Sequence, residues 1–276
     1  MDCTEIISEI QISEIFRLIR RAGDVILSAH ADHSDIGVQE KEGCANFVTF
    51  FDVKVQNMLV DGLKSIIPSA TFIAEENSVA SSQAEKGFCF VIDPIDGTTN
   101  FIRDYKCSVI SVGLLYDGKP LFGAVFNPYS NEMYHAIRGR GAFCNEKRLS
   151  VSNRPLDNAI VCLGTSPYFK DKLIDSIMGL LKELFLRCGD IRRSGSAAYD
   201  LCTLAAGSTD VFFEFRLFPW DYTAASLIIS EAGGIIRQFD SSEVFIDKPC
   251  PVFAASPCNM DELARIFAKY APFAEL

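Results

Sequence analysis

The sequence lacks any long cluster of lysine or arginine and any apolar run long enough to cross a bilayer. Its 36 acidic residues outnumber its 26 basic ones, which gives a formal net charge of −10. A protein that reads a nucleic-acid sequence carries a concentrated basic surface, so neither a nucleic acid nor a membrane is an expected partner. If the ligand is an anion, bound cations must first reverse the sign of the local electrostatic field.

Clustered cysteines are also lacking. The 10 cysteines are scattered along the chain, with no CxxC pair and no zinc-type spacing. Several lie in apolar runs, where we expect small reduced core residues rather than a thiol catalyst. The first residues, Met1 to Glu5, are acidic where a secretory signal is basic. The sequence therefore predicts a soluble protein of the cytoplasm.

The length and composition allow a substantial core. The chain has 276 residues, of which 49% are hydrophobic and 22% charged, and no internal repeat is visible. We expect one compact unit or two closely packed lobes. A change of composition near residues 152–155 predicts the boundary, which gives lobes of residues 1–152 and 153–276.

The first lobe is predicted to be two helices packed on a largely antiparallel sheet. Apolar residues recur at helical spacing over residues 4–30 and 49–66. A short strand is expected at Thr71–Ala74, and a buried strand over residues 88–93 ends at Asp93. Three further strand-like runs separated by turns predict a meander: Ser108–Tyr116, Lys119–Phe126 and Glu132–Ile137.

Strands and helices alternate in the second half, which predicts an α/β lobe. The expected strands are Ala159–Leu163, Val211–Phe215, Ile235–Phe239 and Val252–Ala255. The expected helices are Asp171–Leu186, Ala197–Ala206, Tyr222–Ala232 and a closing helix from Met260. With the first half, of α+β type, this predicts a layered αβαβα sandwich.

An apolar run ends in two carboxylates and a hydroxyl-rich turn at Val91–Phe101. Asp93 and Asp96 are close enough along the chain to hold one cluster of cations, and Gly97 permits a tight turn that exposes backbone N–H groups. Asp-Pro and Asp-Gly usually mark ordinary loops. The combination of a buried strand, two carboxylates and Gly-Thr-Thr instead predicts a site for cations and phosphate.

Two more acidic residues, Glu75 and Asp221, also follow apolar elements. Carboxylates without a histidine partner suit Mg²⁺ rather than zinc. Each residue alone is more often a helix cap or a surface charge, and separation in the sequence does not place them side by side. His30 and His33 suggest a metal site, but a solvated helix end is the favoured interpretation.

Several motifs together resemble the signature set of the inositol monophosphatase family. They occur in the family's order, with similar gaps, and span essentially the whole chain: Phe47–Asp52, Ile73–Glu76, Asp93–Phe101, Gly195–Ala198, Trp220–Asp221 and Glu231–Gly234. The resemblance implies a Mg²⁺-dependent phosphomonoesterase that binds a small phosphate ester. It also implies lithium sensitivity and a homodimer.

The resemblance implies a site for two to three Mg²⁺ ions. Glu75, Asp93 and the carbonyl of Ile95 would hold one ion. Asp93, Asp96 and Asp221 would hold a second ion. A third ion, bound more weakly, would be held by Glu75. The two aspartates of the central motif therefore have different implied roles, because Asp93 bridges two ions and Asp96 binds one.

The resemblance also assigns the groups around the attacking water. Thr98 together with Glu75 would orient and deprotonate this water, and the N–H groups of Gly97 and Thr98 would bind the phosphate. Asp52 and Thr49 match a pair that lies near the water in the family.

The substrate side follows from the same resemblance. The residues implied to contact the substrate are Asp96, Gly195, Ser196, Ala197, Glu214 and Asp221. By sequence alone, Glu214 is an ordinary surface charge at a strand end. Lys41 aligns with a basic residue of the family in a polar segment.

Two departures from the family pattern, Arg216 and Lys106, add positive charge near the implied site. Ordinary surface residues are the favoured interpretation, and a second phosphate on the substrate is the alternative. The first-choice substrate is myo-inositol 1-phosphate, hydrolysed by in-line attack. Fructose 1,6-bisphosphate, 3′-phosphoadenosine 5′-phosphate, histidinol phosphate and a mainly regulatory binding role stay open.

Overall fold

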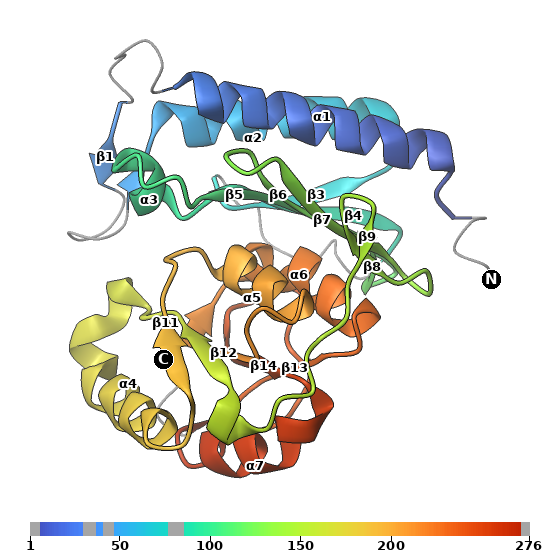
Figure 1. Ribbon diagram of the computed structural model, residues 1–276. Coiled ribbons are helices and arrows are strands. Elements are labelled where there is room, and N and C mark those ends of the chain that lie inside the picture. Colours follow the sequence, from blue (N-terminus) through green and yellow to red (C-terminus); the bar gives the residue numbers. More distant parts are fainter. Residues whose placement is uncertain (1–5, 30–36, 41–46, 77–85, 272–276) are drawn as a thin grey trace.

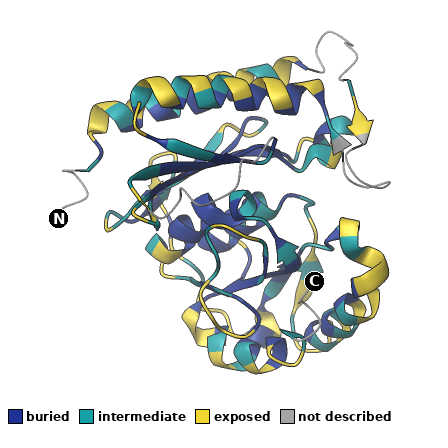
Figure 2. Ribbon diagram, turned by 180° about the vertical axis from the view of Figure 1, so that it is seen from behind, coloured by how far each residue is buried: buried dark blue, intermediate teal, exposed yellow. Residues whose placement is uncertain are grey.

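The computed structural model describes residues 6–29, 37–40, 47–76 and 86–271. These residues form five layers in the order helix, sheet, helix, sheet and helix, which confirms the predicted αβαβα sandwich (Figure 1). Exposed residues gather on the outer helices, and the two inner helices and both sheets are largely buried (Figure 2). No helix within these ranges is both long and apolar enough to span a membrane.

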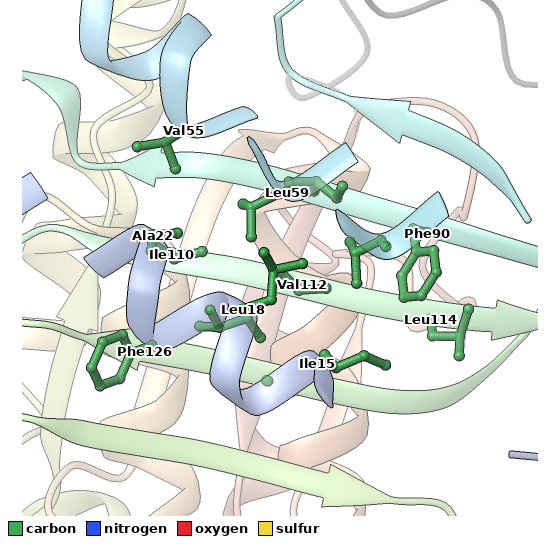
Figure 3. Packing of buried hydrophobic residues seen from close by; sticks show 14 of the residues in the cluster. Ile15, Leu18, Ala22, Val55, Leu59, Phe90, Ile110, Val112, Leu114 and Phe126 are labelled. Carbon is green, nitrogen blue, oxygen red and sulfur yellow. The ribbon is translucent and has the colours of Figure 1, made fainter. Parts of the chain in front are cut away.

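Two helices, α1 (Glu9–Ser28) and α2 (Phe50–Ile66), form the first layer. Helix α1 begins with a capping box in which Ser8 and Gln11 exchange hydrogen bonds. The apolar faces of both helices pack on the first sheet, with the side chains interlocked (Figure 3). The two helices predicted for the first half are confirmed.

The first sheet has seven strands in the order β3-β4-β5-β6-β7-β8-β9. They are β3 (Thr71–Ala74), β4 (Phe88–Asp96), β5 (Val109–Tyr116), β6 (Lys119–Asn127), β7 (Glu132–Ile137), β8 (Ala142–Cys144) and β9 (Lys147–Arg148). Only β3 and β4 pair in parallel, so the predicted meander is confirmed. Strand β4 continues to Asp96, so the prediction that it ends at Asp93 is wrong.

The second sheet has five strands in the order β11-β10-β12-β14-β13. They are β10 (Ile160–Leu163), β11 (Asp190–Arg192), β12 (Val211–Leu217), β13 (Ile235–Arg237) and β14 (Cys250–Ala255). Side chains alternate across β12: Phe213 packs against the outer helices, and Phe212 faces the inner ones. Glu214 therefore points toward the middle layer. A separate pair, β1 (Gln39–Glu40) and β2 (Phe47–Val48), is antiparallel.

Helices α5 (Ala197–Ala205) and α6 (Pro219–Glu231) lie between the sheets, and α4 (Lys170–Phe185) and α7 (Pro257–Phe267) cover the outer face of the second sheet (Figure 1). Helices α6 and α7 each begin three residues before the predicted start, because a proline occupies their first turn. The first sheet ends before residue 152 and the second begins after it, but a lobe boundary there stays a prediction.

Helix α6 lies directly on the backbone of the first sheet. A Cβ atom at Gly123 would lie 2.4 Å from the carbonyl oxygen of Ala224, and one at Gly113 would lie 2.8 Å from a methyl group of Thr223. The helix can approach this closely only because both strand positions are glycine. This contact sets the position of the N-terminus of α6, where Asp221 lies.

We expect Gly123→Ala to lower the free energy of unfolding by about 1–3 kcal/mol, because the added methyl group would press on the backbone of α6. Urea unfolding measures the change. The control is Gly179→Ala in α4, where the nearest atom lies 3.4 Å from the added carbon, so stability should stay unchanged or rise by about 0.5–1 kcal/mol. Equal stability of Gly123→Ala and the native protein would contradict this packing.

Candidate active site

A cavity of about 750 Å³ opens where the two sheets and the inner helices meet. Its lining includes most of the residues predicted for the site: Glu75, Asp93, Ile95, Asp96, Gly97, Thr98, Gly195, Ser196, Ala197, Glu214 and Asp221. Residues from distant parts of the sequence thus meet at one place. Thr49 and Asp52 lie behind this lining and reach it through Thr98.

The parallel pairing of β3 and β4 brings Glu75 beside Asp93. Ala74 pairs with Ile92, and the N–H of Glu75 donates to the carbonyl of Ile92 at 3.2 Å. Asp93 is only 2% exposed, and its Oδ1 accepts a hydrogen bond from the N–H of Ile95 at 3.0 Å. The register between β4 and β5 shifts after Asp93, so the following residues leave the regular ladder as they enter the site.

Asp96 joins the first sheet to the N-terminus of α5. Its Oδ2 accepts hydrogen bonds from Ser196 Oγ at 2.6 Å and from the N–H of Ala198 at 2.7 Å. Its Oδ1 accepts from the N–H of Ala197 at 3.3 Å. A carboxylate at this end of a helix satisfies N–H groups that have no partner within the helix. The Gly-Ser-Ala-Ala motif is therefore held against the central motif by Asp96.

Asp221 lies in the first turn of α6 and lines the cavity. Its Oδ2 accepts a hydrogen bond from the N–H of Phe218 at 2.7 Å. The sequence left open whether Asp221 caps a helix or belongs to a site. Asp221 does both: its Oδ2 accepts a hydrogen bond at the start of the helix, and the residue also lines the cavity.

Burial and mutual repulsion perturb this group of carboxylates. Burial, and after it the charges of Glu75, Asp96 and Asp221, raises the pKa of Asp93 well above its ordinary value. Burial and then the charge of Asp96 raise the pKa of Asp221. Burial raises the pKa of Asp96 to about 6, against the opposing effect of the Ser196 hydrogen bond.

The donor set fits a hard cation. Within the described ranges no lysine or arginine forms an ion pair with Asp93, Asp96 or Asp221, so the negative charges are not neutralised by these residues. Carboxylate and carbonyl oxygens are the ligands that Mg²⁺ prefers. No three acidic, histidine or cysteine side chains of the described residues already surround a common point as metal ligands would.

A chain of hydrogen bonds that involves two threonine hydroxyls lies next to these carboxylates. Thr98 Oγ1 is 3.2 Å from Asp52 Oδ1 and 3.2 Å from the carbonyl oxygen of Ile95. The other oxygen of the fully buried Asp52 accepts from the N–H of Thr49 at 2.7 Å and from its hydroxyl at 2.5 Å. This is the capping box that begins α2. The structure thus brings together Thr49, Asp52 and Thr98, as the sequence predicts.

Gly97 begins the short helix α3 (Thr98–Ile102) with a φ of +90°, a left-handed conformation that favours glycine. A Cβ atom there would also lie 3.1 Å from the carbonyl oxygen of Cys107 and 3.2 Å from that of Gly195. The tight turn predicted at this position is confirmed. It places the start of α3 at the wall of the cavity.

The interpretation of Glu214 as a surface charge is wrong. Its side chain lines the cavity, the residue is only 7% exposed, and its Oε1 accepts from the N–H of Ser166 at 2.8 Å. Burial raises its pKa to about 7. The carboxylate fits because Gly164 has no side chain: a Cβ atom there would lie 1.8 Å from Glu214 Oε2.

The sequence-based prediction missed part of the cavity wall. Residues 164–169, Arg103, Arg193 and Asp200 also line it. The polar run Gly164-Thr165-Ser166-Pro167, which directly follows a buried strand, is a sequence signal that could have indicated residues 164–169 as part of the site. Two basic residues, Arg216 and Lys106, depart from the family pattern. Arg216 lines the cavity, so its interpretation as an ordinary surface residue is wrong.

Lys106 is not among the lining residues and forms an ion pair with Asp104 at 2.5 Å. The interpretation of Lys106 as an ordinary surface residue therefore agrees with the structure. Lys41, His30 and His33 lie outside the described residues.

The raised pKa values of buried carboxylates at the cavity predict how the free energy of unfolding of the metal-free protein depends on pH. The pKa rises from 3.8 to about 6 for Asp96, from 3.8 to about 7 for Asp200 and from 4.5 to about 7 for Glu214. The folded state therefore binds more protons than the unfolded state in this window, so the free energy of unfolding should fall as pH rises from about 4 to about 7.

Thermal unfolding in EDTA between about pH 5 and pH 8 tests this expectation. Mg²⁺ should reduce the loss of stability at the upper end, because cations favour the ionised carboxylates. A melting temperature that rises steadily across the window would contradict it. Glu183, Asp190 and Asp240 have lowered pKa values and act in the opposite direction, but only at lower pH.

The chain is similar to known proteins in sequence and in fold. Residues 10–271 match the model of the inositol monophosphatase family. Inositol monophosphatase 2 of Saccharomyces cerevisiae is 32% identical over 97% of this chain and 96% of its own length, and Nus factor SuhB of Vibrio cholerae is 38% identical over 81% and 83%. The IMPase structure of Thermotoga maritima superposes with a TM-score of 0.83 at 28% identity, over 97% of this chain and all of that one. The chain belongs to the inositol monophosphatase family.

Proposed function

We propose that this protein is a Mg²⁺-dependent phosphomonoesterase that hydrolyses a small polyol or sugar phosphate. One observation carries the proposal: Glu75, Asp93, Asp96 and Asp221 line a single cavity, and burial and the neighbouring carboxylates raise the pKa of Asp93 and of Asp221. Membership of the family supports it. The first candidate substrate is myo-inositol 1-phosphate, and the name of the yeast relative, inositol monophosphatase 2, supports an inositol monophosphate.

The acidic residues have distinct proposed roles. Glu75, Asp93 and the carbonyl of Ile95 would hold one Mg²⁺. Asp93, Asp96 and Asp221 would hold a second ion. A third ion, bound more weakly, would be held by Glu75. When bound, the ions neutralise the charge of the phosphate dianion and lower the pKa of water. This chemistry suits a phosphate monoester, whose own charge protects it from attack and whose uncatalysed hydrolysis is among the slowest that enzymes accelerate.

Thr98 and Glu75 are proposed to orient the attacking water and to take its proton. Because Thr98 can donate its hydroxyl proton to Asp52, its oxygen is free to accept a proton from the water. Thr49 fixes the Asp52 carboxylate from the other side. The N–H groups of Gly97 and Thr98 would bind the phosphate, and the attack would be in line, without a phosphoenzyme.

The part of the cavity wall formed by residues 195–197 and Glu214 is proposed to bind the alcohol part of the substrate. Gly195, Ser196 and Ala197 lie there next to Asp96, and Glu214 presents a carboxylate to the same space. A carboxylate accepts hydrogen bonds from hydroxyl groups of a sugar or polyol. These contacts orient the ring but do not by themselves distinguish one polyol from another.

Release of inorganic phosphate from a panel of esters tests the proposed function. The panel contains myo-inositol 1-phosphate, fructose 1,6-bisphosphate, 3′-phosphoadenosine 5′-phosphate and histidinol phosphate, each with and without Mg²⁺. We expect Mg²⁺-stimulated hydrolysis of at least one sugar or polyol ester. The absence of stimulated release from every ester would contradict the proposal.

A second candidate role is that of a binding or regulatory partner. The relative from Vibrio cholerae carries the name Nus factor, at 38% identity. The presence of all the acidic residues together with Thr98 favours catalysis, since a pure binding protein has no need of them. The homodimer stays a prediction, which light scattering tests: a single species of monomer mass would contradict it.

A further inference from the structure

The side chain of Asn100 joins two segments of the chain that meet at the cavity. Asn100 lies in α3, two residues after Thr98, and lines the cavity. Its Nδ2 donates hydrogen bonds to the carbonyl of Cys107 at 2.6 Å and to the carbonyl of Ser194 at 2.9 Å. An amide nitrogen carries two protons, so this single group holds both carbonyls at once.

The backbone segments around Asn100 approach one another closely. A Cβ atom at Gly97 would lie 3.1 Å from the carbonyl oxygen of Cys107 and 3.2 Å from that of Gly195. A Cβ atom at Gly195, where φ is +87°, would lie 3.1 Å from Asn100 Nδ2 and 3.2 Å from its Oδ1. The amide of Asn100 therefore lies against the backbone of both glycines.

Hydrogen bonds tie the loop 194–196 into one unit. Ser194 Oγ donates to the carbonyl of Ser196 at 3.1 Å and accepts from the N–H of the same residue at 3.1 Å. Ser196 Oγ donates in turn to Asp96 at 2.6 Å. A shift of the Ser194 carbonyl would therefore carry Gly195 and Ser196 with it.

These contacts connect the two parts of the proposed substrate site. The N–H groups of Gly97 and Thr98 are proposed to hold the phosphate, and residues 195–197 the alcohol part. An asparagine that satisfies two carbonyls can serve stability alone. Here one carbonyl lies against Gly97 and the other directly precedes Gly195, so the same amide also sets the spacing of the two parts.

We propose that Asn100 is a positioning residue that sets the distance between the phosphate-binding turn and the wall that binds the alcohol part of the substrate. This inference rests on the proposed function and deepens it, because selectivity for a polyol ester then depends on a side chain outside the proposed chemistry. A substrate that binds at both ends gains from both contacts only when their spacing matches its own. A misplacement of about 1 Å can lower a rate by about 100-fold.

Two esters that differ in their hydroxyl groups test the inference. The best sugar or polyol ester of the panel is compared with cyclohexyl phosphate, whose ring carries no hydroxyl groups. We expect Asn100→Ala to lower kcat/KM for the polyol ester by about 10- to 100-fold, mainly through KM. For cyclohexyl phosphate, and for the inhibition constant of inorganic phosphate, the change should be less than about threefold, because the phosphate-binding turn itself is intact.

Asn259→Ala is the matched control for a loss of stability. Asn259 lies in α7, donates its Nδ2 to the carbonyl of Arg154 at 2.9 Å and is not among the residues that line the cavity. Both variants should lower the melting temperature, because each removes an amide that satisfies a backbone carbonyl. Only Asn100→Ala should change the ratio of kcat/KM between the two esters.

Hydrogen exchange without metal or substrate gives a readout that does not depend on turnover. The backbone N–H groups of residues 194–196 should exchange about tenfold faster in Asn100→Ala than in the native protein, and at the native rate in Asn259→Ala. Equal losses for the two esters, no loss for either, or unchanged exchange in Asn100→Ala would each overturn the inference while the proposed function stands. If the native protein hydrolyses no ester of the panel, the proposed function fails and this inference with it.

Discussion

Asp93→Asn is expected to lower Mg²⁺-dependent turnover by about a thousandfold or more, because its carboxylate is the proposed bridge between two cations. An amide keeps the size of the side chain and can still accept the hydrogen bond from the N–H of Ile95. It cannot supply the negative charge that binds the ions. Steady-state phosphate release with the best substrate of the panel, over a range of Mg²⁺ concentrations, measures the effect.

The stability of the same variant distinguishes a ligand from a structural residue. In EDTA, Asp93→Asn should not lower the melting temperature, because a neutral amide relieves the repulsion among buried carboxylates that raises the pKa of Asp93. Mg²⁺ should raise the melting temperature of the native protein but not that of the variant. The matched control is Asp261→Asn on the surface of α7, which should change neither property. If Asp93→Asn retained Mg²⁺-dependent turnover, the proposed mechanism would be wrong.

Thr98→Ala is expected to lower kcat by about 10²- to 10⁴-fold, because the attacking water loses the hydroxyl that passes its proton on. KM should change little, since the phosphate contact assigned to Thr98 comes from its backbone N–H. Thr98→Ser keeps the hydroxyl and should recover most of the activity.

The neighbouring residue provides the control for Thr98. Thr99 lies in the same short helix and lines the same cavity, but its side chain is exposed and it makes none of the contacts to Asp52. Thr99→Ala should therefore stay within about threefold of the native rate. Equal losses in Thr98→Ala and Thr99→Ala would argue against a specific proton relay through Asp52.

Local signals were sufficient to predict most of the fold. Turn residues separate β5, β6 and β7 so clearly that the meander follows from the sequence, and the apolar spacing of α1 and α2 gives both helices. The predicted starts of α6 and α7 are too late in the sequence, because Pro219 and Pro257 occupy the first turns of these helices. Very short strands such as β8, β9 and β11 have no periodicity that a sequence pattern can reveal.

The site was predictable only where it is local in the sequence. Asp93 and Asp96 lie in the last part of one strand, β4, but Glu75 joins them through the parallel pairing of β3 with β4, and Asp221 through the packing of α6 on Gly123. These are long-range contacts, which the family resemblance supplied and the residue pattern did not. The burial of Glu214 and the loop at Ser166 depend on the packing of the second sheet, so sequence reasoning placed Glu214 on the surface.

The most direct test of the proposed metal site is a crystal structure of the protein with Mn²⁺ and phosphate, recorded with anomalous scattering. We predict two strong peaks about 3.5–4 Å apart, both in contact with Asp93. One should also contact Glu75 and the carbonyl of Ile95, and the other Asp96 and Asp221, with the phosphate beside Gly97 and Thr98. A cavity with no anomalous peak, or ions held by other side chains, would contradict the assignment of these carboxylates as the metal ligands.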